Sequence, residues 1–182
     1  MTRIPTIADK GALPAAHHDV WDAIARSRGR VQGPFTVLLH RPELTRRIAH
    51  VGAYVRFESP LPPADRELAV IAAARALDCQ FEWGAHEVEA AKAGVRREAI
   101  AAIRDGRAPA GLTEDEALVV AYVTQLLQRH RVDDPTFVAM RARFGVEGLV
   151  ELTATVGYYG MLACVLNAFD VAPEAGADVL PA

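Results

Sequence analysis

The sequence has few cysteines, little excess charge and no long apolar run. Cys79 and Cys164 are the only cysteines among 182 residues, too few for a disulfide framework. A net charge of -3 offers no broad basic surface to nucleic acid or anionic lipid. Polar side chains interrupt the most apolar segment, 149–169, and the first residues lack the apolar core of a secretion signal. We therefore expect no nucleic-acid partner, no membrane partner and a cytoplasmic protein.

Common cofactor and catalytic motifs are also missing. The sequence contains no glycine-rich phosphate loop, no dinucleotide fingerprint and no Gly-x-Ser-x-Gly elbow. Cys79, Glu82 and His86 are possible metal ligands, but their spacing is not that of a known zinc site. We therefore expect neither a cofactor nor a metal.

The pattern of apolar residues and helix breakers predicts an all-α protein. Hydrophobic residues make up 51% and charged residues 24% of the chain, as in an ordinary globular domain. Strand-like runs, in which apolar and polar residues alternate between turns, are scarce. Apolar residues recur instead at helical spacing. We predict one domain over residues 1–182, a multi-helix bundle with its core at about 30–170, an N-terminal helical extension over 1–29 and a loose tail over 171–182.

Capping residues and helix breakers set the expected helix boundaries. Asp78 is a plausible N-cap, Thr113 with Glu116 fits a capping box, and Gly145 and Gly148 punctuate before the last helix. The expected helices cover residues 16–28, 35–40, 42–58, 64–77, 78–93, 95–104, 113–129, a segment starting at 134, and 149–169.

The residues that suggest chemistry lie between Glu67 and His86. Cys79, Glu82 and His86 stand at i, i+3 and i+7 of one predicted helix, so they share a face. Apolar and aromatic neighbours, including Trp83, indicate that this face is buried. Glu67 lies twelve residues before Cys79, and a tight turn between the helices would bring it to the same face. Two carboxyl groups and one imidazole in an apolar pocket suit acid/base chemistry.

The charge state of this group stays open at the level of sequence. The positive end of a helix dipole and an adjacent imidazolium would favour a thiolate at Cys79. Glu82 would favour a protonated His86 but disfavour that thiolate.

These residues resemble the carboxymuconolactone decarboxylase family, which also contains the alkylhydroperoxidase D-like proteins. Glu67, the segment 79–86 (CQFEWGAH) and Gly94 carry the motif, and the order of the helices agrees over residues 30–170. The resemblance implies the all-α fold of that family, no cofactor, and a homo-oligomer that is a dimer, trimer or hexamer.

The resemblance also implies two chemistries. In the peroxidase branch, a Glu is followed after twelve residues by C-x-x-C-x-x-x-H. The two thiols form a redox disulfide, and the Glu and the His act as a proton relay. Glu67, Cys79 and His86 fit this motif. The second thiol falls on Glu82, which cannot form or resolve a sulfenic acid. In the decarboxylase branch, His86 would transfer a proton during removal of a carboxyl group from a small lactone.

We therefore predict a carboxymuconolactone decarboxylase-like enzyme that performs cofactor-free acid/base chemistry on a small carboxylated or lactone-like molecule. The predicted catalytic residues are His86, Glu82, Cys79 and Glu67, with Trp83 and Tyr158 binding substrate. One alternative is a thiol-dependent alkyl hydroperoxidase that uses Cys79. Another is an oligomeric scaffold that has lost the chemistry.

Structural roles compete with these catalytic assignments. Cys79 is equally well explained as a small buried hydrophobe, and Glu67 as a first-turn glutamate that favours a helix N-terminus. Tyr158 has an alternative role at an interface edge. Cys164 lies among apolar residues of the last helix, where core packing is expected.

Overall fold

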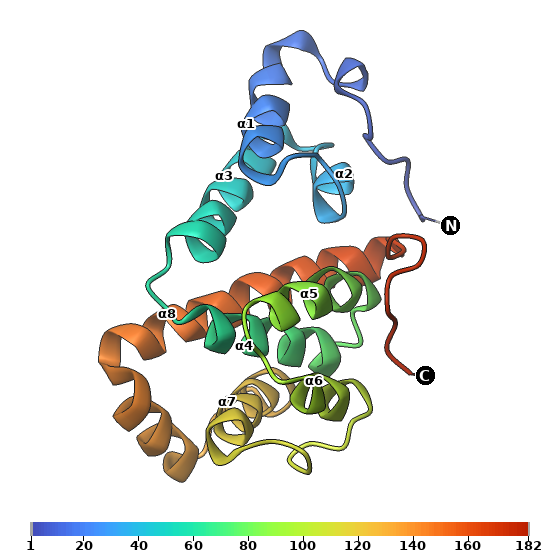
Figure 1. Cartoon of the computed structure of the whole chain (residues 1–182). Coiled ribbons are helices and arrows are strands. Elements are labelled where there is room, and N and C mark those ends of the chain that lie inside the picture. The colour runs from blue at the N-terminus through green and yellow to red at the C-terminus, as the bar shows by residue number, and fades with distance from the viewer. Residues whose placement is uncertain (1, 182) are drawn as a thin grey trace. The chain divides into compact units, whose positions relative to one another are not determined.

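A computed structural model describes residues 2–181, which form helices, turns and loops without a strand. The all-α prediction is therefore confirmed (Figure 1). The chain forms two compact units, one made of residues 2–59 and 164–172 and the other of residues 60–163 and 173–181. Each unit is described by itself, and the single domain over 1–182 stays a prediction.

The first unit is built around α1 and α3. Val20 and Ile24 of α1 are fully buried and pack with Phe35 and Leu39 in a small apolar core. Pro34 and Pro42 stand at the first turns of their helices, where the missing N–H of proline costs nothing. The elements of this unit are η1 (Lys10–Ala12), η2 (Ala15–His17), α1 (His18–Arg28), α2 (Pro34–Leu38), α3 (Pro42–Ala53), the π-helical turn η3 (Tyr54–Glu58) and the end of α8.

The second unit surrounds helix α4, which packs against α5, α6 and α7. As predicted for an enclosed helix, α4 buries every residue from Glu67 to Ala74. Burial of Leu68 and Ile71 contributes about 1.5–3 kcal/mol each. The elements are α4 (Pro63–Ala76), α5 (Gln80–Lys92), α6 (Arg97–Arg104), α7 (Glu114–Thr124), the π-helical turn η4 (Gln125–Arg129) and most of α8 (Asp134–Phe169).

The turn between α4 and α5 corrects one predicted boundary. Asp78 was expected to cap the second helix, but it has a left-handed backbone with φ of 48° and its carboxylate pairs with Arg75. Because Asp78 occupies the turn itself, Cys79 becomes the N-cap residue, with an extended backbone and no capping hydrogen bond from its side chain.

The capping box of α7 is confirmed. The Thr113 hydroxyl accepts from the Glu116 N–H at 3.2 Å, and the Glu116 carboxylate accepts from the Thr113 N–H at 2.8 Å. Arg96 also donates to Glu116 at 2.5 Å. These hydrogen bonds, from Arg96 above all, lower the pKa of the Glu116 carboxyl group.

Helix α8 leaves helical geometry at Gly145, where φ is 68°, so the predicted break is confirmed there, while Gly148 stays helical. An apolar 18-residue window of α8 has the length and hydropathy of a membrane span, but 56% of it is buried within the structure, as in a core helix.

Cys164 is exposed, which corrects the expectation of core packing. The buried side of α8 carries Leu162 and Ala163, then Leu166 one turn later. At about 100° per residue, Cys164 falls on the opposite side of the helix.

The C-terminal segment has no regular structure, yet α5 holds it in place, unlike the loose tail expected. The Gln80 amide donates to the Leu180 carbonyl at 3.2 Å and accepts from the Leu180 N–H at 2.8 Å. The Trp83 indole N–H donates to Asp178 at 3.1 Å. Leu180 is 4% exposed and belongs to the apolar core.

Gly84 permits this close approach of the C-terminal segment. A Cβ atom at Gly84 would lie 2.9 Å from Cβ of Ala177 and 3.0 Å from the carbonyl oxygen of Asp178. One face of α5 is therefore occupied by the C-terminal segment.

Candidate functional site

Three of the predicted catalytic side chains meet inside the second unit. Glu67 comes from α4, and Glu82 and His86 come from α5. The Glu67 Oε2 atom lies 2.8 Å from His86 Nδ1, and the Glu82 Oε2 atom lies 3.5 Å from His86 Nε2. All three residues are at most 5% exposed. The structure thus places one imidazole between two buried carboxyl groups.

The local sequence explains why these groups converge. Glu82 and His86 are four residues apart on α5, and side chains with this spacing are neighbours on one helix face. The tight turn at Asp78 reverses the chain, so that α4 packs against α5 and Glu67 reaches His86 from the facing helix. The reach of Glu67, which the sequence left as an inference, is therefore shown.

The contact with Glu67 orients the imidazole. A carboxylate 2.8 Å from Nδ1 accepts a hydrogen bond from an Nδ1–H group. This contact leaves Nε2 as the nitrogen that faces Glu82. The 3.5 Å separation between Nε2 and Glu82 is longer than an ordinary hydrogen bond.

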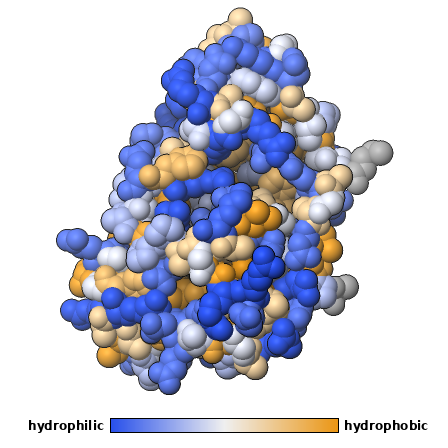
Figure 2. All heavy atoms as spheres, in the orientation of Figure 1, coloured by the Kyte–Doolittle hydropathy of each residue, from blue (hydrophilic) through white to orange (hydrophobic). Residues whose placement is uncertain are grey.

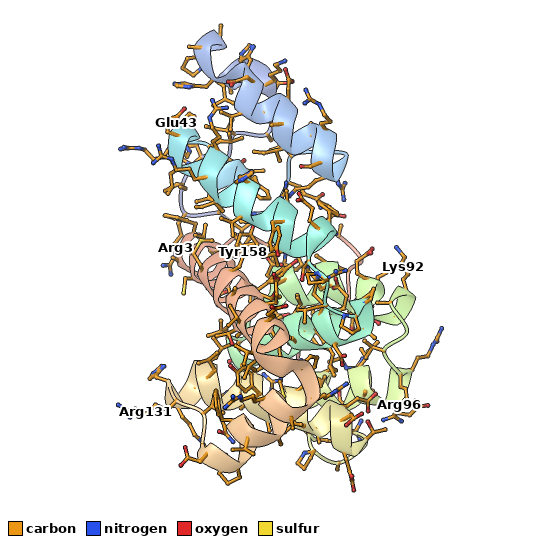
Figure 3. The ribbon with its side chains drawn as sticks, turned by 90° about the vertical axis from the view of Figure 1, so that its left-hand side faces the viewer. Arg3, Glu43, Lys92, Arg96, Arg131 and Tyr158 are labelled. Carbon is orange, nitrogen blue, oxygen red and sulfur yellow. The ribbon has the colours of Figure 1, made fainter. Side chains whose placement is uncertain are left out.

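Two tyrosines of α8 complete the surroundings of His86. The Tyr159 ring contacts the imidazole edge to face, with centroids 4.9 Å apart and an angle of 83° between the planes. Tyr158 packs edge to face on Tyr159 at 5.5 Å; Figure 3 labels Tyr158 on its helix. Both tyrosines are buried, and the Tyr159 ring restricts the rotation of the imidazole.

Arg66 supplies a positive charge next to the carboxylate of Glu67. Its Nε atom lies 3.5 Å from Glu67 Oε1, and its side chain is 15% exposed. With Arg66 and Glu67 both charged, the cluster is neutral overall in two forms. In one, His86 is protonated and Glu82 ionised; in the other, His86 is neutral and Glu82 carries the proton. Transfer of a proton between Nε2 and Glu82 would therefore leave the net charge of the buried group unchanged.

Cys79 lies at the N-cap of α5, three residues before Glu82, and is 0% exposed. Its N–H donates to the carbonyl of Ala74 at 2.8 Å and its carbonyl accepts from the N–H of Trp83 at 3.0 Å. The position at the positive end of the helix dipole, expected from the sequence, is therefore present. Its burial fits the structural alternative equally well.

Trp83 lies on α5 three residues before His86, and it contacts the C-terminal segment. Its side chain is 0% exposed and its indole N–H bonds to Asp178. In this position the indole packs the core and holds the C-terminal segment. Its predicted role in substrate binding stays a prediction, as does that of Tyr158.

Arg66 and Tyr159 belong to the site more directly than the sequence indicated. Arg66 directly precedes Glu67, and that adjacency was the only available signal of a role. Tyr159 could not be separated from Tyr158 by sequence, because only the rotation of α8 decides which ring touches His86. Among residues 2–181, no three His, Cys, Asp or Glu side chains are arranged to hold a metal ion.

The sequence matches one known family. Residues 42–125 match the model of the carboxymuconolactone decarboxylase family. This segment contains the whole of α4 and α5, and with them Glu67, Glu82 and His86. A comparison with curated protein sequences gives no match.

Solved structures share the fold at low sequence identity. An alkylhydroperoxidase AhpD core protein from Ralstonia eutropha JMP134, described as peroxidase-related, has a TM-score of 0.79 and 19% identity over 96% of this chain and 93% of that chain. A peroxidase-related protein from Silicibacter sp. TM1040 has a TM-score of 0.75 and 15% identity over 97% of this chain and 93% of that chain.

The debrominase Bmp8 also has this fold. Its apo structure gives a TM-score of 0.76 and 16% identity over 94% of this chain and 92% of that chain. A cysteine-to-alanine variant of Bmp8 was solved in complex with 2,3,4-tribromopyrrole. At these identities the likeness establishes the fold alone. Residues 42–125 thus match the carboxymuconolactone decarboxylase family, and the chain shares the fold of the alkylhydroperoxidase AhpD core protein.

Proposed function

We propose that this protein is a cofactor-free acid/base enzyme that decarboxylates, or moves a proton on, a small carboxylated or lactone-like molecule. One observation carries the proposal: His86 is held between the buried carboxyl groups of Glu67 and Glu82 at 2.8 and 3.5 Å. A general acid or base must have a defined orientation and a partner that returns its proton. Here Glu67 supplies the orientation and Glu82 the partner.

The proposed mechanism follows from this geometry. In decarboxylation, the bond between the substrate carbon and its carboxylate breaks, carbon dioxide leaves, and His86 Nε2 gives a proton to that carbon. Glu82 then returns a proton to Nε2 and takes one up from solvent. In a proton shift, His86 Nε2 takes a proton from one substrate carbon and returns it to another. Glu67 keeps its hydrogen bond to Nδ1 throughout, which stabilises the imidazolium form when His86 is protonated. Because the three groups are at most 5% exposed, little water competes with these contacts, and the electrostatic interactions are stronger than in solvent.

The comparisons support a small, cyclic substrate without identifying it. The matching family takes its name from a decarboxylase of a lactone. The structural neighbour Bmp8 is a debrominase with a bound tribromopyrrole, also a small ring.

The second candidate is a thiol-dependent hydroperoxidase, and the position of Cys79 favours it. A thiol at the N-terminus of a helix is stabilised as the thiolate, and Cys79 is the N-cap of α5. Glu82 occupies the place where the peroxidase branch has its second cysteine, so the thiol exchange of that branch has no partner here. We therefore rank this activity below acid/base chemistry.

Proton exchange in D₂O tests the leading proposal. A panel of small carboxylated lactones is incubated with the protein, and deuterium incorporation and carbon dioxide release are measured. We expect His86→Gln and Glu82→Gln to lower the rate by about 10²–10⁴-fold. The matched controls His50→Gln and Glu89→Gln replace side chains outside the site and are expected to retain the rate.

The same samples separate the alternatives. Turnover that survives His86→Gln would contradict the acid/base proposal. Peroxide consumption that disappears in Cys79→Ser but persists in Glu82→Gln would favour the hydroperoxidase. If no panel member reacts and none raises the thermal stability, the inactive scaffold is the better description.

We further propose that the protein acts as a homo-oligomer in the cytoplasm. The first half of α8 exposes Phe137, Val138, Val146 and Val150 by 44–64%, and exposed apolar residues gathered on one segment are typical of a subunit contact. Figure 2 shows apolar areas among hydrophilic residues on the face in view. Light scattering after size exclusion is the test: a dimer, trimer or hexamer is expected, and a monomer would contradict the proposal.

A further inference from the structure

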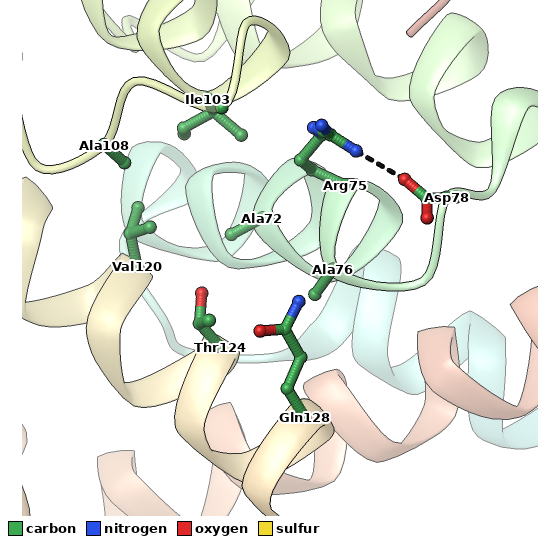
Figure 4. Close-up of a pocket in the computed structure, with 10 residues that line it drawn as sticks. Ala72, Arg75, Ala76, Asp78, Ile103, Ala108, Val120, Thr124 and Gln128 are labelled. Carbon is green, nitrogen blue, oxygen red and sulfur yellow. Dashed lines mark hydrogen bonds and ion pairs between the residues drawn. The ribbon is translucent and has the colours of Figure 1, made fainter. Parts of the chain in front are cut away.

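A second cavity lies in the same unit, away from the acid/base site. It has a volume of about 260 Å³ and is lined by α4, α6, α7 and η4 (Figure 4). On α4 it is bordered by Ala72 and Ala76, which at about 100° per residue lie some 140–180° around the helix from Glu67. None of Glu67, Glu82 and His86 lines it, so the cavity is separate from the proposed catalytic groups.

The cavity combines an apolar floor with polar groups. Ala72, Ala76, Ile103 and Val120 form the floor. Figure 4 shows the Thr124 hydroxyl and the Gln128 amide at one side, and Arg75 turned toward Asp78. An apolar cavity with a few convergent polar groups is the usual form of a small-molecule site.

Polar side chains of the cavity have few hydrogen-bond partners within the protein. The side chain of Thr124, which is partly buried, and that of Gln128, which is exposed, form no hydrogen bond with another of residues 2–181. Arg75 pairs with Asp78 through Nη1, while its Nε atom is buried and lacks a hydrogen-bond partner in this part of the chain. A buried polar atom such as Arg75 Nε normally has a partner, so a ligand would gain a hydrogen bond that the fold leaves unmade.

The backbone at this cavity is also unusual. Gln128 belongs to η4, a π-helical turn that directly follows α7. Single π-helical turns are rare and occur frequently at functional sites. The wider turn changes the direction of Gln128 relative to Thr124, four residues earlier, and both side chains reach the same cavity.

We propose that this cavity binds a small carboxylate with a compact apolar body. The Thr124 hydroxyl, the Gln128 amide and the guanidinium of Arg75 can all donate, so the side-chain donors outnumber the groups that can only accept. Asp78 is the one carboxylate that lines the cavity, and it is already paired with Arg75, with 76% of its side chain exposed. The cavity volume of about 260 Å³ lies just below the usual range for small-molecule sites, which favours a compact ligand.

Titration with benzoate, followed by amide NMR of the full chain, tests this site without any activity assay. We expect saturable shifts at Thr124, at Gln128 and along the C-terminal half of α4, and at least about tenfold weaker binding of the neutral isostere benzamide. Gln128→Leu removes the amide, and Ala76→Leu fills the cavity. Each is expected to weaken benzoate binding at least about tenfold, whereas Arg141→Gln on the exposed side of α8 leaves it unchanged.

A further variant separates this proposal from the catalytic one. Benzoate binding that is lost in Glu82→Gln but kept in Gln128→Leu would place the ligand at the acid/base site and overturn the proposal. Equal or tighter binding of benzamide would overturn the carboxylate class. If Ala76→Leu does not fold, the nearly isosteric Thr124→Val takes its place, and unchanged affinity in that variant would also count against the site.

Discussion

Replacement of Glu67 measures how much its contact with His86 stabilises the protein. The carboxylate lies 2.8 Å from His86 Nδ1, and both side chains are only 4–6% exposed. Glu67→Gln keeps an acceptor of the same shape but removes the charge. Since hydrogen bonds to charged groups contribute about 1.5–3 kcal/mol and neutral ones about 0.5–1.5 kcal/mol, we expect a loss of about 1–1.5 kcal/mol in the free energy of unfolding.

Glu67→Ala removes the acceptor as well as the charge. His86 Nδ1 then loses its partner, and Arg66, 15% exposed, loses the neighbouring carboxylate. Breaking a buried charged contact on one side costs about 3–5 kcal/mol. For a protein of this size each kcal/mol lowers Tm by about 2–4 °C. The expected decreases in Tm are therefore about 2–6 °C for Glu67→Gln and roughly 6–20 °C for Glu67→Ala.

Urea unfolding followed by circular dichroism provides the assay for both variants. Glu89→Gln on the surface of α5 serves as the control and should change the free energy of unfolding by no more than about 1 kcal/mol. Equal losses for Glu67→Gln and Glu67→Ala would refute the assignment of a charge-assisted hydrogen bond. An increase in stability for Glu67→Gln would show that burial of the charge outweighs its contact with His86.

Three further results are expected. Gly84→Ala should lower the free energy of unfolding, measured in urea, by about 1–3 kcal/mol and speed proteolysis of the C-terminal segment. Gly157→Ala, with open space around its Cβ position, should raise the free energy of unfolding by about 0.5–1 kcal/mol. Equal effects of the two substitutions would refute the close approach of the C-terminal segment to Gly84. Hydrogen bonding, above all from Arg96, lowers the pKa of the Glu116 carboxyl group. Ionised Glu116 therefore stabilises the folded protein fully above the unfolded pKa of about 4.3, and this stabilisation is lost as pH falls through the lower folded pKa. The loss caused by Glu116→Gln should accordingly shrink between about pH 6 and about pH 3 in urea titrations, and a loss that does not change with pH would contradict this cause. A thiol reagent should label Cys164 rapidly in the folded protein and Cys79 only after unfolding; rapid labelling of both would contradict the burial of Cys79.

Local signals in the sequence predicted much of the fold. Thr113 and Glu116 define a helix start through contacts three residues apart, and Gly145 supplies a positive φ where other residues are strained. Such features depend on neighbours in the chain, so they can be predicted without knowledge of the packing.

The candidate site was predictable in part for a related reason. Glu82 and His86 lie on one face by helical geometry alone, and the family motif added Glu67 from the preceding helix. The sequence could not show that the Tyr159 ring packs against the imidazole, because the rotation of a long apolar helix depends on all its neighbours.

The errors have the same physical origin. Asp78 has the residue type of an N-cap, but its pairing with Arg75 and its left-handed backbone move the cap by one position. Cys164 follows two buried residues of α8, and only the helical rotation turns it outward. Both outcomes depend on tertiary packing, which local propensity does not contain.

The hydrogen bonds between α5 and the C-terminal segment have a practical consequence for handling the protein. Leu180 fills part of the core, and Gln80 and Trp83 bind the segment on the same helix that carries His86. An affinity tag or reporter fused directly after this segment would disturb its contacts with α5, the helix that carries Glu82 and His86. Expression clones intended for enzymology are better tagged at the other terminus, and a loss of activity in a C-terminal fusion should first be checked for a displaced α5.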